Sequence, residues 1–305
     1  MLLITGATGY LGRALVPALE ARGLPLRIAM RDGDLGSGAD ASARSRGVLD
    51  LARVESAPAS TFEGLSTALH CAGLAHRSAP VEDYLKLNTE ATLRIAQRAH
   101  IGGAGAFIFI SSLNIVPVGA DSASLAAEAY PEPPDPYAAS KWRAEQELHH
   151  YCAGVNMALR IVRPALIYDG ELTANLAHLQ RLVRRWPLAL PALGSRSMIA
   201  RPDLVALLGS IAEETDQFSC VIPATDGEHY DVRRIGRALG GCGRPTLPRA
   251  LLRLASIVLD ARSGGRWGDA WQTLATAHWV GAPHREYVWR PRWTLESLLA
   301  SDAAL

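Results

Sequence analysis

The chain has 305 residues, of which 49% are hydrophobic and 20% charged, and its formal net charge at pH 7 is +1. This composition is typical of a globular protein with one large core or two unequal ones. So small a net charge produces no long-range attraction to nucleic acid or to an anionic membrane, so any anion-binding site must be local. The start of the chain lacks a basic signal-peptide region and the apolar runs are too short to span a membrane, which predicts a cytoplasmic protein.

Cysteine and lysine are both rare, and each rarity carries information. The four cysteines stand apart without a CxxC pair, so the sequence predicts neither a zinc cluster nor a disulfide framework, and no metal site is expected. Only Lys86 and Lys141 are lysines among the 31 basic residues. A lysine at a chemically meaningful spacing is therefore informative in this chain.

Short apolar runs alternate with amphipathic stretches through the first half, as in βαβ units with a parallel sheet. The predicted strands cover residues 2–5, 26–30, 47–49, 67–72, 106–111 and 157–162. Helical periodicity marks residues 10–22, 81–101 and 137–153. Residues 1–163 are therefore predicted to form an α/β domain of the Rossmann type, with a doubly wound parallel sheet.

The regular alternation ends after Arg163 and Pro164. Residues 164–305 are predicted to form a smaller substrate-binding region. Within it, residues 221–223 are expected to return a strand to the sheet, and 231–239 and 247–260 have helical periodicity. Residues 33–45, rich in Gly, Ser, Ala and Asp, predict a surface loop.

A glycine-rich turn follows the first predicted strand and opens a helix, with the sequence Gly6-Ala7-Thr8-Gly9-Tyr10-Leu11-Gly12. Glycines permit a tight turn, and a helix N-terminus presents unpaired N–H groups and the positive end of a dipole to a pyrophosphate. The position between a first strand and a first helix predicts a dinucleotide site. The alternative is a flexible turn without a ligand.

The end of the second predicted strand bears on the choice of cofactor, because an acidic residue there bonds the 2′-hydroxyl of NAD. Here Arg31 follows the strand and Asp32 comes next. The guanidinium of Arg31 can pair with a 2′-phosphate, which favours NADP over NAD. Asp32 leaves NAD open, and Arg31 as a solvated loop residue is the alternative.

Tyr137 and Lys141 begin the helix that follows the proline-rich segment 131–136. Four residues apart, they share a helix face. An isolated phenol titrates at about pH 10, and a nearby ammonium group and an oxidised nicotinamide ring would lower that pKa. The pair predicts proton transfer by Tyr137 in a nicotinamide-dependent oxidoreductase. A chance spacing of surface residues is the alternative.

Together the glycine turn, the strand end His70-Cys71-Ala72-Gly73, the pair Ser111-Ser112 and the Tyr137/Lys141 pair resemble the extended short-chain dehydrogenase/reductase family. The resemblance is nearest to the nucleotide-sugar epimerase branch and covers nearly the whole chain. It implies a nucleotide-sugar substrate and a homodimer formed through residues 81–101 and 137–153.

The resemblance also implies which residues meet the cofactor. Asp50 and Leu51 would flank the adenine, and Lys141 would bind the nicotinamide ribose. Asn88 matches a helix asparagine near the cofactor, with a local bond on a helix face as the alternative. The implied cofactor residues are Gly6, Thr8, Gly9, Tyr10, Leu11, Gly12, Arg31, Asp50, Leu51, Ala72, Gly73, Leu74, Asn88 and Lys141.

The third catalytic position of the family, a Ser or Thr after the fifth strand, matches Ser112 rather than Ser111. Its hydroxyl would bond the sugar oxygen that becomes a carbonyl and orient it for Tyr137. Arg196 matches an arginine that clamps the substrate diphosphate, and Asn175 matches a nucleotide contact. A surface ion pair and a helix-surface position are the respective alternatives.

Two departures from the family pattern bear on the reaction. Leu113 and Asn114 follow Ser112 where the family's dehydratases have an Asp-Glu pair, so dehydration is disfavoured. Arg163 stands where many epimerases have an asparagine before the proline, which argues against ordinary galactose 4-epimerase specificity. Arg31 points the same way, because an epimerase recycles a retained cofactor and usually holds NAD.

The function that these residues favour is nucleotide-sugar epimerisation by hydride transfer at a sugar carbon. An NADPH-dependent nucleotide-sugar 4-ketoreductase would use the same residues and is the first alternative. A reductase of a non-sugar ketone comes next. A dinucleotide-sensing protein without catalysis comes last, because the chain retains Tyr137 and Lys141.

Overall fold

The computed structural model describes most of the chain, namely residues 1–31, 45–75, 79–117, 130–172, 174–185, 188–216, 218–241, 243–254, 257, 277–278 and 289–302. Asp32, nearly all of the predicted loop 33–45 and part of the predicted helix 247–260 lie outside them. The chain divides into two compact units. The first contains Met1–Val116, Ser124–Pro164 and Leu204–Ala224, and the second contains Ala165–Asp203 and Thr225–Leu305. The domain boundary expected after residue 163 stays a prediction.

A seven-stranded sheet forms the centre of the first unit, in the order β10-β6-β5-β4-β1-β2-β3, and every neighbouring pair is parallel. Its strands are β1 (Leu2–Thr5), β2 (Leu26–Met30), β3 (Ser45–Val48), β4 (Thr67–His70), β5 (Ala106–Ile110), β6 (Ala158–Pro164) and β10 (Cys220–Ala224). The strand order reverses between β1 and β4, as in Rossmann-type folds. The predicted fold class is confirmed, and so is the return of a strand at 221–223.

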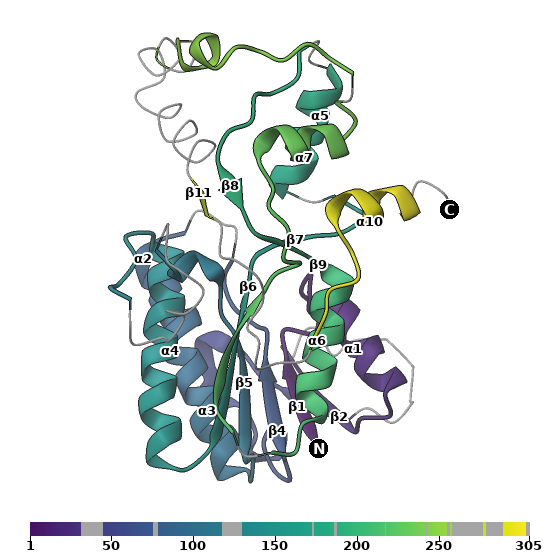
Figure 1. Cartoon of the computed structure of the whole chain (residues 1–305). Coiled ribbons are helices and arrows are strands. Elements are labelled where there is room, and N and C mark those ends of the chain that lie inside the picture. The colour runs from purple at the N-terminus through teal and green to yellow at the C-terminus, as the bar shows by residue number, and fades with distance from the viewer. Residues whose placement is uncertain are drawn as a thin grey trace. The chain divides into compact units, whose positions relative to one another are not determined.

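Helices cover both faces of this sheet (Figure 1). On one face lie α3 (Ala91–Ile101) and α4 (Pro136–Gly154), and on the other lie α1 (Gly12–Ala21) and α6 (Arg201–Glu213). An ion pair of 2.6 Å joins Arg22, just after α1, to Glu213 at the end of α6. Because both faces are covered, the central strand β5 is apolar throughout, and all five of its residues are buried.

The helical stretch predicted at 81–101 forms, but its winding changes in the middle. The short helix α2 (Val81–Tyr84) runs into a π-helical segment, Leu85–Glu90, which leads into α3. π-Helical turns are rare and frequently mark functional sites. This one carries the buried residues Asn88 and Thr89.

Helix α6 was missed in the sequence analysis, although signals for it exist. Pro202 is the second residue of the helix, where a missing N–H costs nothing. Its apolar residues recur three or four positions apart, and those with no exposed surface are Leu204, Leu207, Leu208 and Ile211. The Arg- and Pro-rich stretch before it obscured this periodicity.

The second unit contains α5 (Ala174–Arg185), α7 (Val232–Ala238) and α10 (Leu295–Asp302). Its two small sheets pair β7 (Leu166–Tyr168) with β9 (Met198–Ala200), and β8 (Ser195–Arg196) with β11 (Ala277–His278). A separate core gathers Tyr168, Met198, Tyr230, Leu239 and Leu295. The helix predicted at 231–239 is confirmed as α7. None of the described helices has both the length and the apolar character that a membrane crossing needs.

Candidate active site

The carboxyl ends of β1 and β4 lie side by side where the strand order reverses, which is where open α/β sheets bind ligands. Gly6 follows β1 with a φ of +77°, in the left-handed region that favours glycine. A Cβ on Gly6 would come within 2.6 Å of the backbone nitrogen of Ala72. The position therefore requires glycine for both its conformation and its close packing.

The rest of the glycine turn leads into α1. The Gly9 N–H donates to the carbonyl of Gly6 at 3.0 Å, and Leu11 at the N-cap supplies no side-chain bond to the first helical amides. Thr8, Gly9 and Tyr10 are exposed. An accessible helix N-terminus without a side-chain cap offers N–H donors and positive potential, which fit the diphosphate of a dinucleotide.

Ala72, Gly73 and Leu74 form the turn after β4. Asn88 bonds this turn with both side-chain groups, because its Oδ1 accepts the Leu74 N–H at 2.7 Å and its Nδ2 donates to the Leu74 carbonyl at 3.0 Å. A Cβ on Gly73 would lie 2.9 Å from Asn88 Oδ1 and 3.4 Å from Lys141 Nζ. The turn, Asn88 and Lys141 are thus brought together, and a Cβ at position 73 would have to displace the Asn88 oxygen that bonds Leu74.

Asp135 fixes the start of α4. Its carboxylate accepts the Ala138 N–H at 2.8 Å, and Pro136 occupies the first helical position, where its fixed φ is favourable. This start puts Tyr137 in the first turn of α4 and Lys141 one turn later. The geometry of the predicted pair therefore depends on a local cap.

Ser140 connects α4 to the π-helical segment. Its hydroxyl is fully buried, accepts from Asn88 Nδ2 at 3.0 Å and donates to the carbonyl of Tyr137 at 2.7 Å. The Thr89 hydroxyl donates to the Ser140 carbonyl at 2.8 Å. Next along the helix, Lys141 donates from Nζ to the carbonyl of Ile110 at 3.0 Å. Ser140 therefore ties Asn88 to α4, and the Ile110 carbonyl positions the Lys141 amino group.

Ser112, rather than Ser111, affects the phenol of Tyr137. Ser112 lies two residues after β5, its hydroxyl accepts the Asn114 N–H at 3.1 Å, and its side chain acts to lower the pKa of Tyr137. The neighbouring Ser111 hydroxyl is buried and has no hydrogen-bond partner among the described residues. A buried hydroxyl with unused capacity at the carboxyl end of β5 fits a site that takes a polar ligand.

The electrostatics of the pair differ from the sequence-based expectation. Burial raises the pKa of Tyr137 to about 12, although the hydrogen bond from Ser112 opposes the rise, and Lys141 is not among its causes. Burial lowers the pKa of Lys141 to about 8, against the opposing effects of Cys71 and Glu145. The protein alone therefore does not prepare Tyr137 as a base, and further positive charge is needed.

Two neighbours of Tyr137 were not foreseen from the sequence, namely Ser140 and Tyr84. The ring centroids of Tyr84 and Tyr137 are 6.2 Å apart, with planes at 64° in an edge-on contact, and Tyr84 is buried. Tyr84 precedes Asn88 by four residues and so belongs to the same helix face. The four-residue spacing of Tyr84 and Asn88 was the sequence signal that could have placed Tyr84 near this site.

The three residues expected around the adenosine all follow strands at the carboxyl edge of the sheet. Arg31 comes directly after β2 and is exposed. Asp50 comes two residues after β3, and its carboxylate accepts the Ala52 N–H at 3.0 Å at the start of the short 3-10 helix Leu51–Ser56. Leu51 is half-buried. Their contacts with a cofactor stay predictions.

The substrate residues expected from the resemblance lie in the second unit. Arg196, on β8, is half-buried, and burial lowers the pKa of its guanidinium. Its backbone N–H and carbonyl pair with those of Tyr230 at 3.0 and 3.2 Å. Asn175 lies on α5, but its side chain is outside the described residues. Their role in substrate binding stays a prediction.

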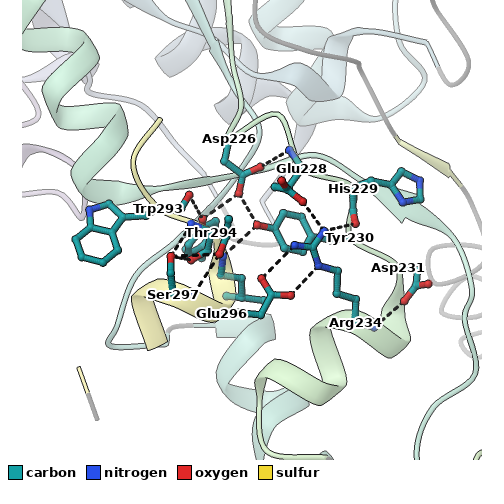
Figure 2. A network of polar contacts seen from close by, with 12 residues as sticks. Asp226, Glu228, His229, Tyr230, Asp231, Arg234, Trp293, Thr294, Glu296 and Ser297 are labelled. Atoms are coloured by element: carbon teal, nitrogen blue, oxygen red, sulfur yellow. Dashed lines mark hydrogen bonds and ion pairs between the residues drawn. The ribbon is translucent and has the colours of Figure 1, made fainter. Parts of the chain in front are cut away.

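A polar network holds Tyr230, the backbone partner of Arg196, in place (Figure 2). The Tyr230 hydroxyl donates to Asp226 at 2.6 Å and accepts the Leu295 N–H at 3.0 Å. Figure 2 shows the guanidinium of Arg234 beside the Tyr230 ring, and its carbon is 4.4 Å from the ring centroid. Burial raises the pKa of Asp226 to about 6. This network anchors the strand that carries Arg196.

Arg163 has a different environment from the one expected at a substrate contact. Its guanidinium pairs with Glu145 of α4, with Nε donating to Oε1 at 3.0 Å and Nη2 donating to Oε2, and both side chains are fully buried. The charge of Arg163 is thus neutralised inside the first unit. Arg163 therefore gives no argument about sugar specificity.

The groups at the carboxyl ends of β1, β4 and β5 are hydrogen-bond donors that suit a dinucleotide rather than ligands that suit a metal. They comprise a glycine turn at a helix N-terminus, the Gly73 cradle, the Ser111 hydroxyl and the ammonium group of Lys141. Within the described ranges, no group of three or more His, Cys, Asp or Glu side chains is arranged to hold a metal ion.

Residues 2–186 match the NAD dependent epimerase/dehydratase family. The UDP-glucose 4-epimerase of Vibrio cholerae is 28% identical over 254 residues, which cover 78% of this chain and 74% of that protein. The 3-diazoavenalumate denitrifying reductase of a Streptomyces species is 29% identical over 269 residues, which cover 82% of this chain and 84% of that protein.

Among solved structures, MoeE5 in complex with UDP-glucuronic acid and NAD is similar, with a TM-score of 0.73 and 20% identity. The match covers 100% of this chain and 99% of MoeE5. At that identity the likeness establishes the fold.

Proposed function

Because the chain belongs to the NAD dependent epimerase/dehydratase family, we propose that it is a nucleotide-sugar epimerase. It is an enzyme of the extended short-chain dehydrogenase/reductase type. The alternative of a dinucleotide-sensing protein without catalysis is therefore not supported. The observation that carries the proposal is that α4 brings Tyr137 and Lys141, one helical turn apart, to the carboxyl end of β5, where Lys141 Nζ donates to the Ile110 carbonyl at 3.0 Å. The buried ammonium group of Lys141 beside Gly73 completes the arrangement.

The residues divide the chemistry among themselves. When bound, an oxidised nicotinamide would accept a hydride from the sugar carbon, return it to the other face and place a positive charge near Tyr137. Tyr137 takes the proton from the hydroxyl on that carbon and later gives it back. Ser112 accepts from the Asn114 N–H, and its single hydrogen would turn from the phenol of Tyr137 to the reacting sugar oxygen when the substrate binds. Lys141, held by the Ile110 carbonyl, would bind the ribose with its ammonium group.

The substrate proposal extends to the second unit. Arg196 is proposed to clamp the diphosphate and Asn175 to meet the nucleotide, because a guanidinium binds phosphate oxygens with paired donors. MoeE5, which shares the fold, was solved with UDP-glucuronic acid and NAD. For this chain we propose NADP over NAD, because Arg31 directly follows β2.

A 4-ketoreductase is the second candidate, and a specific observation favours it. The Streptomyces relative, matched over 84% of its length, is named a reductase of 3-diazoavenalumate, so it supports net reduction without supporting a sugar substrate. A net reduction would also suit the NADP preference that Arg31 predicts. Reduction of a non-sugar ketone is the third candidate, and it would need neither Arg196 nor Asn175.

Incubation with UDP-, GDP- and dTDP-sugars, with and without NADPH or NADH, tests the proposal. Absorbance at about 340 nm follows cofactor consumption and chromatography identifies the sugars. An epimerase forms an isomer without net cofactor consumption. Stoichiometric oxidation of reduced cofactor would identify a reductase instead. Turnover of none of the nucleotide-sugars would contradict both candidates.

A further inference from the structure

His70, at the end of β4, has no part in the chemistry proposed above, yet it is fully buried beside the dinucleotide turn. Its ring packs against Phe107 and Phe109, with centroids 6.1 Å away in each case. This packing on β5 fixes the plane of the imidazole. The directions in which its two nitrogens can bond are therefore fixed as well.

Both nitrogens of His70 have hydroxyl partners. Nδ1 lies 2.7 Å from Thr5 Oγ1, and Nε2 lies 3.0 Å from Thr92 Oγ1. The Thr92 hydroxyl donates its single hydrogen to the carbonyl of Asn88 at 2.7 Å, so it can only accept from His70. Nε2 therefore carries the imidazole hydrogen, and Nδ1 accepts from Thr5.

Burial keeps this imidazole neutral. Desolvation, with a smaller contribution from the nearby charge of Lys141, lowers the pKa of His70 to about 3. A second proton on Nδ1 would also leave the Thr5 hydroxyl hydrogen without its acceptor. The Nε2–H tautomer is thus the form that the surroundings of His70 select.

The hydrogen bonds of His70 close a ring around the turn 72–74. Thr5 Oγ1 accepts the Ala72 N–H at 3.3 Å, so the Thr5 hydroxyl joins His70 to the start of the turn. At the other end of the turn, the side chain of Asn88 bonds Leu74 at 2.7 and 3.0 Å. One continuous path therefore ties both ends of the turn to His70.

We propose that His70 is a positioning residue of the dinucleotide site, whose neutral imidazole sets the turn 72–74 by linking Thr5 to Thr92. The inference rests on the proposed function, because it requires this turn to contact the cofactor. Gly6 and Gly73 make that turn closely packed, so a small displacement would misplace the backbone that receives the dinucleotide. A residue that served stability alone would alter unfolding and leave cofactor affinity unchanged.

Three variants separate these roles. Thr92→Val keeps the shape of the side chain and removes the hydroxyl between His70 and Asn88. His70→Leu removes both imidazole bonds, and His70→Gln keeps a donor near the Nε2 position. Ser210→Ala is the matched control, because the Ser210 hydroxyl donates to the Ala206 carbonyl one helical turn earlier, as Thr92 does to Asn88.

Binding of NADPH and of NADH to the full-length variants is measured by cofactor fluorescence, alongside urea unfolding. We expect Thr92→Val to raise the Kd of the preferred cofactor about five- to tenfold, because one buried hydrogen bond is lost. His70→Leu has a larger effect, and His70→Gln recovers part of it. Ser210→Ala leaves Kd unchanged, and kcat at saturating cofactor stays near the wild-type value in Thr92→Val.

An unchanged Kd in folded Thr92→Val overturns the inference and leaves the proposed function standing. Failure of the wild type to bind either cofactor overturns both. If His70→Leu does not fold, the comparison of Thr92→Val with Ser210→Ala decides. NMR of ¹⁵N-labelled histidine gives an independent readout, in which His70 is an Nε2–H tautomer that does not titrate between about pH 5 and 8. An Nδ1–H tautomer contradicts the proposed link.

Discussion

Lys141 keeps an amino group almost wholly inside the first unit, where burial lowers its pKa from 10.5 to about 8. The unfolded chain therefore holds this proton more tightly than the folded one. Between these two pKa values the free energy of unfolding rises with pH, and below about pH 8 the cost of burying the charge is fully present. Catalytic placement of this lysine thus opposes stability at neutral pH.

Lys141→Met should raise the free energy of unfolding at pH 7 by about 1–3 kcal/mol, because it removes a buried charge and retains the side-chain length. Urea unfolding at pH 7, 8.5 and 10 measures the difference from wild type, which should shrink as the pH rises. A difference that stays constant with pH would show that the ammonium group carries no burial cost. Turnover should be lost in the same variant.

Arg31 is the residue on which the proposed choice of cofactor depends. Arg31→Gln should weaken NADPH binding by about tenfold or more and leave NADH binding unchanged, because only NADPH has a 2′-phosphate for the guanidinium. Fluorescence titration with both cofactors checks this. Arg53→Gln, at another exposed arginine of the first unit, is the control and should change neither affinity. Equal losses for both cofactors would refute a phosphate contact.

At the scale of elements, a buried ion pair joins α4 to β6. Glu145 lies one turn after Lys141 on α4, and both members of the Glu145–Arg163 pair are fully buried. Removing one partner leaves an uncompensated charge, so Glu145→Gln should cost about 3–5 kcal/mol of unfolding free energy. The double variant Glu145→Leu/Arg163→Met should recover much of that loss in urea unfolding. Additive losses would mean that packing, rather than charge, sets the cost.

The sequence predicted best those elements that local signals determine. The strands β1 and β2 have the expected bounds, and Asp135 with Pro136 marks the start of α4 within one residue of the prediction. The glycine turn was equally readable, because the tight packing of Gly6 follows from its place between β1 and α1. These signals involve residues close together in the chain.

Features that depend on distant partners could not be predicted in this way. The π-helical winding around Asn88 and the bonds from Asn88 to Ser140 join residues far apart in the sequence. The pKa of Tyr137 is raised because several elements bury its phenol. The four-residue spacing to Lys141 shows none of this burial, so it led to the wrong expectation of a lowered pKa. Arg163 was likewise interpreted as a departure that bears on sugar specificity, because its partner Glu145 was not visible in a local pattern.

At the scale of the whole molecule, the resemblance implies a dimer through α2, α3 and α4. Residues of the π-helical segment between α2 and α3, together with residues of α4, form a surface hollow that includes Leu85, Glu90, Trp142 and Gln146. Leu85→Arg should convert a dimer into a monomer in light-scattering measurements, because a symmetric interface would bury two such charges. Leu251→Arg, at an exposed leucine of the second unit, is the matched control and should leave the dimer intact. A wild-type monomer would contradict the expected assembly.

The central claim is that a hydride leaves a sugar carbon and returns to the same carbon, with Tyr137 moving the hydroxyl proton. The most direct measurement uses a nucleotide-sugar that carries deuterium on the reacting carbon. We expect an epimerised product that retains the deuterium at that carbon, and a loss of about 10²–10⁴-fold in rate for Tyr137→Phe. The proposed hydride return would be contradicted if the deuterium were released into added cofactor or exchanged with water. Full activity of Tyr137→Phe would contradict the proposed proton transfer.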